Sequence, residues 1–188
     1  MWARLESNTI VEILTRPKAL QIGGVQYPSN IFSMWTEAEL AVIGIVPVTI
    51  DGTNLKDKEY YINTDITYAY DTETGKATGT YGSATAMSLN DTGSGESLVR
   101  GLKYKHKEKI NLGASSRLAP TDWMVLREAD GGTAMPSDIK TKRAAVRTKA
   151  NEMCTQIDAA SDVPALMALY VYNNAETPVR PLGELPEV

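Results

Sequence analysis

The chain has 188 residues, of which 43% are hydrophobic and 22% charged, a composition typical of a globular protein with one large domain or two small ones. A formal net charge of -4 argues against a general nucleic-acid binder, and no apolar run approaches the roughly 20 residues of a membrane span. The first residues lack the apolar core of a secretory signal, and a single cysteine excludes an intrachain disulfide framework. Both features favour a chain made in a reducing cytoplasm.

Residues 1–91 are predicted to form a small β-rich head domain with one short helix. Two strands are expected before residue 17, around a turn at Ser7-Asn8, and a second strand pair bends at Gly23-Gly24. Thr36 and Glu39 have the spacing of a capping box, which predicts a short helix that stops at Gly44.

The remainder of the head is predicted to be β-structure. Residues 45–50 favour a strand, and Pro47 indicates an edge strand because proline has no N–H for a second ladder. Residues 60–81 predict a β-hairpin that turns at residues 71–75.

The composition changes after Leu89. Residues 92–97 are small, polar and glycine-bearing, which predicts a flexible linker. Residues 98–188 are expected to form a mainly helical domain for packing and attachment, ending in a proline-rich stretch that is either frayed or laid along a neighbour's surface. The fold class is therefore α+β.

The longest helical pattern runs over residues 136–160, with apolar side chains on one narrow stripe. The stripe is too thin to hold the helix alone, so we expect an antiparallel pair with a second helix capped by Asp162. Packing of the stripe on symmetry copies of itself is the alternative, which a buried unpaired Arg143 would disfavour. The stripe residues are Ile139, Arg143, Val146, Met153 and Ile157.

Four lysines alternate with other residues just after the predicted linker. On a strand they would form one basic face for an anion or a nucleic acid, whereas on a helix they would scatter. The element type stays open at this point, and contact with solvent or with an acidic neighbour is the commoner role of such a face. The four residues are Lys103, Lys105, Lys107 and Lys109.

No catalytic, cofactor or metal site is predicted. His106 and Cys154 are the only histidine and cysteine, which leaves no zinc constellation, and Cys154 is more typical of a small buried side chain than of a nucleophile. Residues 51–59 resemble a calcium loop only loosely, and residues 93–95 lack the lysine of a P-loop. We therefore expect a protein that is not an enzyme.

Large aromatic residues are the first candidates for contact surfaces, because Tyr and Trp dominate interface energetics. Trp35 and Trp123 lie beside predicted helix starts, with Thr121 as the cap of the second, and are expected to enter the core. The predicted interface residues are Tyr60, Tyr61 and Tyr68 together with the stripe residues.

Two segments of the chain resemble the tail-fibre-associated and tail-fibre-assembly-like proteins of tailed bacteriophages. The first covers residues 10–81 and includes WTEAEL at residues 35–40; the second joins LAPTDW at residues 118–123 to RAAVR at residues 143–147. In that family a small β-rich head precedes a helical region with an Asp-Trp and an Arg-rich helix.

The resemblance implies a non-enzymatic virion protein of the tail, in the fibre or baseplate region, that is made in the host cytoplasm and acts through protein–protein contacts. It also implies tail-fibre or baseplate partners and a homo-oligomer, for example around a threefold fibre axis. Two alternatives stay open: a chaperone of fibre assembly that leaves the finished particle, and an anion or nucleic-acid binding module that uses the face from Lys103 to Lys109.

Overall fold

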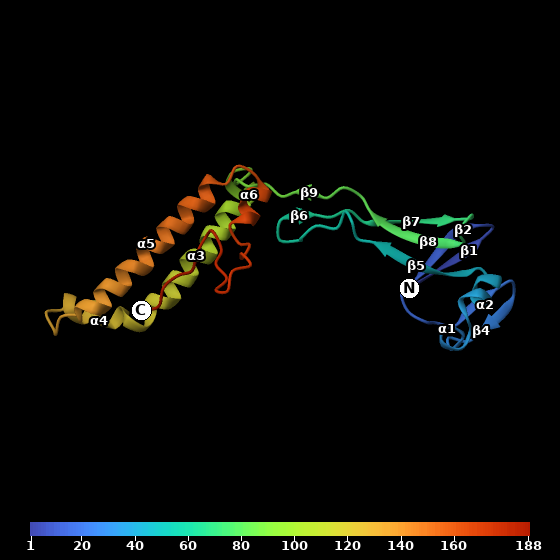
Figure 1. Ribbon diagram of the computed structural model, residues 1–188, viewed down its shortest axis with the longest axis horizontal. Coiled ribbons are helices and arrows are strands. Elements are labelled where there is room, and N and C mark those ends of the chain that lie inside the picture. Colours follow the sequence, from blue (N-terminus) through green and yellow to red (C-terminus); the bar gives the residue numbers. More distant parts are fainter. The chain divides into compact units, whose positions relative to one another are not determined.

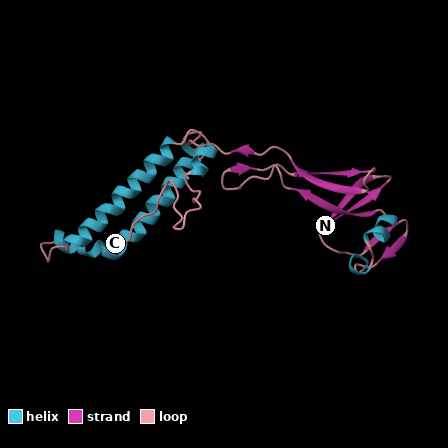
Figure 2. Cartoon of the chain, viewed as in Figure 1, coloured by secondary structure: helices cyan, strands magenta, loops and turns pink.

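The computed structural model describes all residues from 1 to 188 and has the predicted α+β class. The chain divides into two units, Met1–Thr85 and Ala86–Val188. Strands dominate the first unit and long helices the second, as the magenta arrows and cyan coils of Figure 2 show. None of the helices combines the length and apolar character needed to cross a membrane.

A five-stranded sheet forms the centre of the first unit (Figure 1). Its strand order is β2-β1-β5-β8-β7, and every neighbouring pair is antiparallel except β5 and β8. The two end strands of this order, β2 and β7, also approach each other, so the sheet curls. The strands are β1 (Trp2–Glu6), β2 (Thr9–Leu14), β5 (Ile45–Asp51), β7 (Ile66–Asp71) and β8 (Lys76–Tyr81).

The prediction that Pro47 marks an edge strand is wrong, because β5 is the central strand. β1 pairs with the first half of β5 and β8 with the second half, beginning at Val48. The N–H of Val48 donates to the carbonyl of Met1 at 3.1 Å. Since antiparallel bonds alternate, the nitrogen of Pro47 faces away from β1, on the side where the β8 ladder has not yet begun. The missing N–H therefore interrupts neither ladder.

The predicted hairpin of residues 60–81 forms only over β7 and β8. Residues 63–65 are not part of a strand. The side-chain amide of Asn63 accepts from the N–H of Lys56 and donates to the carbonyl of Lys56, both at 2.8 Å. The hydroxyl of Thr64 accepts from the N–H of Gly82 at 2.7 Å. These side chains offer the backbone an alternative to the ladder. The short strand β6 (Tyr61–Ile62) pairs instead with β9 (Thr85–Ala86).

The two faces of the sheet carry different clusters, as the alternation of side chains along a strand requires. The hairpin β3 (Leu20–Ile22) and β4 (Val25–Tyr27) and the short helices α1 (Ile31–Met34) and α2 (Glu37–Val42) pack on one face. The single turn α1 adds to the one helix predicted here. The first cluster comprises Leu14, Leu20, Ile31, Leu40 and Ile45. The second, on the other face, comprises Ala3, Val46 and Ala77.

The capping box of α2 is confirmed. The hydroxyl of Thr36 accepts from the N–H of Glu39 at 3.3 Å, and the Glu39 carboxylate accepts from the N–H of Thr36 at 2.8 Å. These bonds from Thr36 lower the pKa of Glu39. Because the pKa of Glu39 is lower in the folded state than in the unfolded state, its ionised carboxylate stabilises the first unit at neutral pH. This contribution is lost as the pH falls through the folded-state pKa.

Replacing Thr36 with alanine is expected to destabilise the first unit by about 1 kcal/mol, since the N-terminal amides of α2 lose their acceptor. Urea unfolding followed by tryptophan fluorescence measures this change, because Trp2 and Trp35 both lie in this unit. Thr72→Ala, at an exposed turn position, is the matched control and should change stability by less than about 0.5 kcal/mol. A Thr36 variant as stable as that control would contradict the role of the cap.

The second unit begins with a closed loop rather than the flexible linker predicted at residues 92–97. Thr92 and Val99 form a β-bridge, and the Asp91 carboxylate accepts from the N–H of Gly101 at 2.8 Å and from Arg100. A short 3₁₀ turn, η1 (Gly95–Ser97), lies within the loop. The small polar residues that predicted flexibility serve here as turn and capping residues.

Helix α3 (Leu102–Leu118) includes the lysine run, so the open choice between strand and helix is settled as helix. The 3₁₀ turn η2 (Ala119–Thr121) leads to α4 (Asp122–Ala129), and α5 (Ser137–Ala159) and α6 (Val163–Ala168) follow. Bonds from Lys107 to Asp158 and from Arg143 to Leu118 show that α3 and α5 run antiparallel.

The partner of the long helix is therefore α3 and not the helix after Asp162. The Asp162 carboxylate does cap α6, accepting from the N–H of Ala165 at 2.8 Å, but α6 has only six residues. A helix of 17 residues such as α3 covers far more of the stripe on α5 than α6 can. The proline-rich stretch lies along the helices of its own unit, with Leu182 fully buried.

Candidate functional site

Arg143 ties the start of α4 to α5. Its side chain is buried, and its guanidinium donates to the carbonyl of Leu118 at 2.7 Å, to the hydroxyl of Thr121 and to the carboxylate of Asp122 at 2.6 Å. The guanidinium, which would disfavour burial of the stripe if it had no partner, thus has three acceptors. Thr121 precedes α4 as predicted, but its hydroxyl bonds Leu118 and Arg143 rather than the helix N-terminus.

In this position, the apolar side chains of α4 are not buried in the core. None of its eight residues is buried; Trp123 is 52% exposed, Val125 43% and Leu126 67%. The guanidinium of Arg127 lies 4.8 Å from the ring of Trp123 and covers part of it. Trp123 therefore does not enter the core, contrary to the prediction. We name the exposed apolar side chains Trp123, Val125 and Leu126 the α4 face.

The four lysines do not form one basic face, because on a helix they separate into two pairs four residues apart. Lys107 bonds the carboxylate of Asp158 at 2.8 and 3.0 Å, and Lys103 bonds the carbonyl of the same residue at 2.9 Å. Lys105 and Lys109 lie on the other side of the helix. Lys103 and Lys107 thus contact an acidic residue of the same chain. The four lysines do not form the continuous basic surface on which the anion-binding alternative depends.

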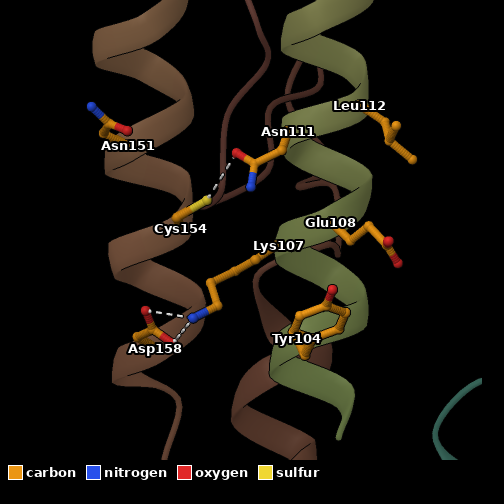
Figure 3. A pocket seen from close by; sticks show the side chains of 8 residues that line it. All are labelled: Tyr104, Lys107, Glu108, Asn111, Leu112, Asn151, Cys154 and Asp158. Atoms are coloured by element: carbon orange, nitrogen blue, oxygen red, sulfur yellow. Dashed lines mark hydrogen bonds and ion pairs between the residues drawn. The ribbon is translucent and has the colours of Figure 1, made fainter. Parts of the chain in front are cut away.

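A groove of about 600 Å³ lies between α3 and α5, and Cys154 is one of the residues that line it (Figure 3). Figure 3 shows the Cys154 thiol directed toward Asn111, 3.9 Å from its side-chain oxygen, and the Lys107–Asp158 pair beside it. Burial raises the pKa of the Cys154 thiol, so the thiol stays protonated at neutral pH. The groove offers contact surface, not an activated nucleophile. It is lined by Tyr104, Lys107, Glu108, Asn111, Leu112, Asn151, Cys154 and Asp158.

The tyrosines predicted as contact residues are mostly engaged within the first unit. Tyr60 is buried, with 6% of its surface exposed, so it is not available to a partner. Tyr61 and Tyr68 are half-buried. Trp35, expected in the core, is 36% exposed and meets Tyr27 edge to face at 5.8 Å.

The stripe on α5 is likewise used inside its own unit. Arg143, Val146, Met153 and Ile157 are buried and Ile139 is half-buried. This burial occurs in a single chain, without a second copy. His106 is also buried, with its Nδ1 2.8 Å from the hydroxyl of Tyr170.

The α4 face is the part of the site that sequence patterns did not locate. Residues 123–126 are four apolar residues in succession, so periodicity cannot tell which side of the helix is covered. Its position depends on bonds to α5, between Arg143 and Asp122, 21 residues apart, and between Lys140 and Glu128 at 2.6 Å.

No group of three or more His, Cys, Asp and Glu side chains is arranged to hold a metal ion. Comparisons with protein-family models, with curated proteins and with solved structures find no match to this chain.

Proposed function

We propose that this chain is a non-enzymatic structural protein of a phage tail, in the fibre or baseplate region, and that it acts through protein–protein contacts. The α4 face carries the proposal. Exposed tryptophan and leucine side chains on a helix that is anchored from beneath are typical of a contact surface, because such residues gain most when a partner covers them.

The motif LAPTDW supports the same proposal from the sequence. Its Asp122 is the acceptor that Arg143 of the motif RAAVR binds at 2.6 Å, and its Trp123 is the exposed aromatic residue. The two motifs of the second segment that resembles phage tail proteins are thus in contact. Asp122 links α4 to Arg143, and Trp123 next to it is exposed on the surface.

Replacing Trp123 with alanine is expected to weaken binding to purified phage tails about thirtyfold, which corresponds to about 2 kcal/mol for an interface residue of this kind. The free energy of unfolding should change by less than about 0.5 kcal/mol because the side chain is more than half exposed. Co-sedimentation of the chain with tails of the phage that encodes it measures the first quantity and urea unfolding the second.

Val42→Ala is the matched control, since Val42 is 87% exposed and belongs to the first unit. It should leave binding unchanged. Equal binding by the wild type and the Trp123 variant would show that the α4 face is not the contact surface.

A further inference from the structure

The pair of helices α3 and α5 has two grooves, one on each side of the buried stripe of α5. Positions of α5 at successive spacings of four and three residues recur on one side of the helix. One such row lines the groove described above, which we name the open groove, and its continuation; the row comprises Arg147, Asn151, Cys154 and Asp158. A second row lines a hollow on the other side of the stripe and comprises Ala145, Lys149 and Glu152.

The second groove is filled by the C-terminal residues of the chain itself. The methyl Cδ1 of Leu185 packs so close to α3 that a Cβ at Gly113 would lie 3.2 Å from it. On the side of α5, a Cβ at Gly183 would lie 2.8 Å from Nζ of Lys149. Residues 183–188 belong to no helix or strand and run beside α3 (Figure 1). The space beside this helix pair therefore accommodates a chain without regular structure.

The open groove has polar and apolar side chains but no segment of the chain lies in it. It continues into a smaller hollow of about 360 Å³, because Asn111 and Asn151 line both. The Nδ2 of Asn111 and the side-chain amide of Asn151 make no hydrogen bond within the chain. Leu112, on the α3 side, is 64% exposed. A ligand in this groove thus has hydrogen-bonding groups and an apolar contact available to it.

The two ends of the open groove carry opposite charges. At one end, Arg147 is exposed and forms no ion pair, whereas Arg143 beside it already has three acceptors. At the other end, Glu108 forms no ion pair, and Lys107 is neutralised by Asp158. The seven residues of α3 from position 108 to position 115, which lines the hollow with Arg147, span about 10 Å. An acidic side chain is therefore favoured at the Arg147 end and disfavoured at the other.

We infer that the open groove binds an extended peptide segment of another protein, with an acidic side chain at Arg147 and an apolar side chain on Leu112. The N–H and C=O groups of an extended backbone need partners, and the side-chain amides of Asn111 and Asn151 both donate and accept. A helix satisfies its own backbone and would leave these amides unpaired. The site is separate from the α4 face and adds a second contact surface to the one proposed above.

A displayed library of short random peptides, selected on the immobilised full-length chain, tests this site. Selection should enrich peptides with an acidic residue close to an apolar one, and fluorescence anisotropy measures the affinity of each labelled peptide. Arg147→Glu should weaken binding about tenfold, since a charge-assisted bond is lost and replaced by repulsion. The same peptide with lysine in place of its acidic residue should bind the Arg147→Glu variant more tightly than the wild type. Asn151→Ala, which removes one backbone partner, should weaken binding about fivefold.

Lys142→Glu is the matched control, because Lys142 is an exposed cation of α5 that lines neither part of the open groove. It should leave the affinity unchanged, and circular dichroism checks that every variant keeps its helices. Trp123→Ala should also leave peptide binding unchanged, so failure of this site and failure of the α4 face are distinguishable.

Two results would overturn the inference. The first is that no peptide is enriched, or that the enriched peptides bind the wild type, Arg147→Glu and Asn151→Ala equally well. The second is that the enriched peptides become helical on binding, as a gain in the circular dichroism signal of helix, because the groove would then take a third helix and not an extended segment.

Discussion

Replacing Ile157 with alanine is expected to destabilise the helical unit by about 2–5 kcal/mol, the range for truncating a buried aliphatic side chain. Ile157 is fully buried, as are Leu102, Met153 and Leu166 of the same unit. The loss combines the transfer free energy of the removed methylene and methyl groups with the cost of a cavity that the helices cannot close completely. Urea unfolding followed by circular dichroism at 222 nm measures it, because the long helices lie in this unit.

Thr155→Ala is the control for this change, since Thr155 is exposed two positions earlier on the same helix. It should alter stability by less than about 0.5 kcal/mol. The pair of variants also separates the two interpretations of the stripe. If Ile157→Ala left stability unchanged and abolished self-association instead, the stripe would be a seam between copies.

Replacing Arg143 with alanine is expected to destabilise the helical unit by about 3 kcal/mol. Breaking a buried, hydrogen-bonded ion pair costs about 3–5 kcal/mol, and the partial exposure of Asp122 reduces this toward the lower end. The carbonyl of Leu118 and the hydroxyl of Thr121 also lose a donor. Because the start of α4 loses its bond to Arg143, both the stability of the helical unit and the affinity of binding through Trp123 should decrease.

Arg147→Ala provides the comparison for Arg143→Ala, because Arg147 is an exposed arginine one turn further along α5. Its removal should change the free energy of unfolding by less than about 0.5 kcal/mol. Similar losses for the two arginines would mean that helix charge, and not the bonds to Leu118, Thr121 and Asp122, accounts for the effect.

Local signals predicted much of the fold. The turn at Ser7-Asn8, where both residues have positive φ, and the capping box of Thr36 each depend on residues at most three positions apart. Such features are visible in sequence because the interacting groups are neighbours along the chain. The helix over residues 137–159 was equally clear from its apolar period.

Features that depend on distant partners were not predictable in the same way. Pro47 lies in the central strand because the ladder changes sides there, which requires knowledge of where β1 and β8 pair. The alternation of lysines from residue 103 fits a strand by period and a helix by propensity, and Asp158 lies more than 50 residues away. The exposure of Trp123 has the same kind of cause, since Arg143 and Lys140 of α5 hold α4 through Asp122 and Glu128.

The composition of purified particles tests most directly whether the chain is a structural part of a phage tail. On the proposal that the chain is part of a phage tail, quantitative mass spectrometry of mature phage particles should detect peptides from both of its units, in fixed proportion to the tail-fibre or baseplate proteins. Peptides that are abundant in infected cells and missing from mature particles would contradict this account and identify an assembly chaperone instead.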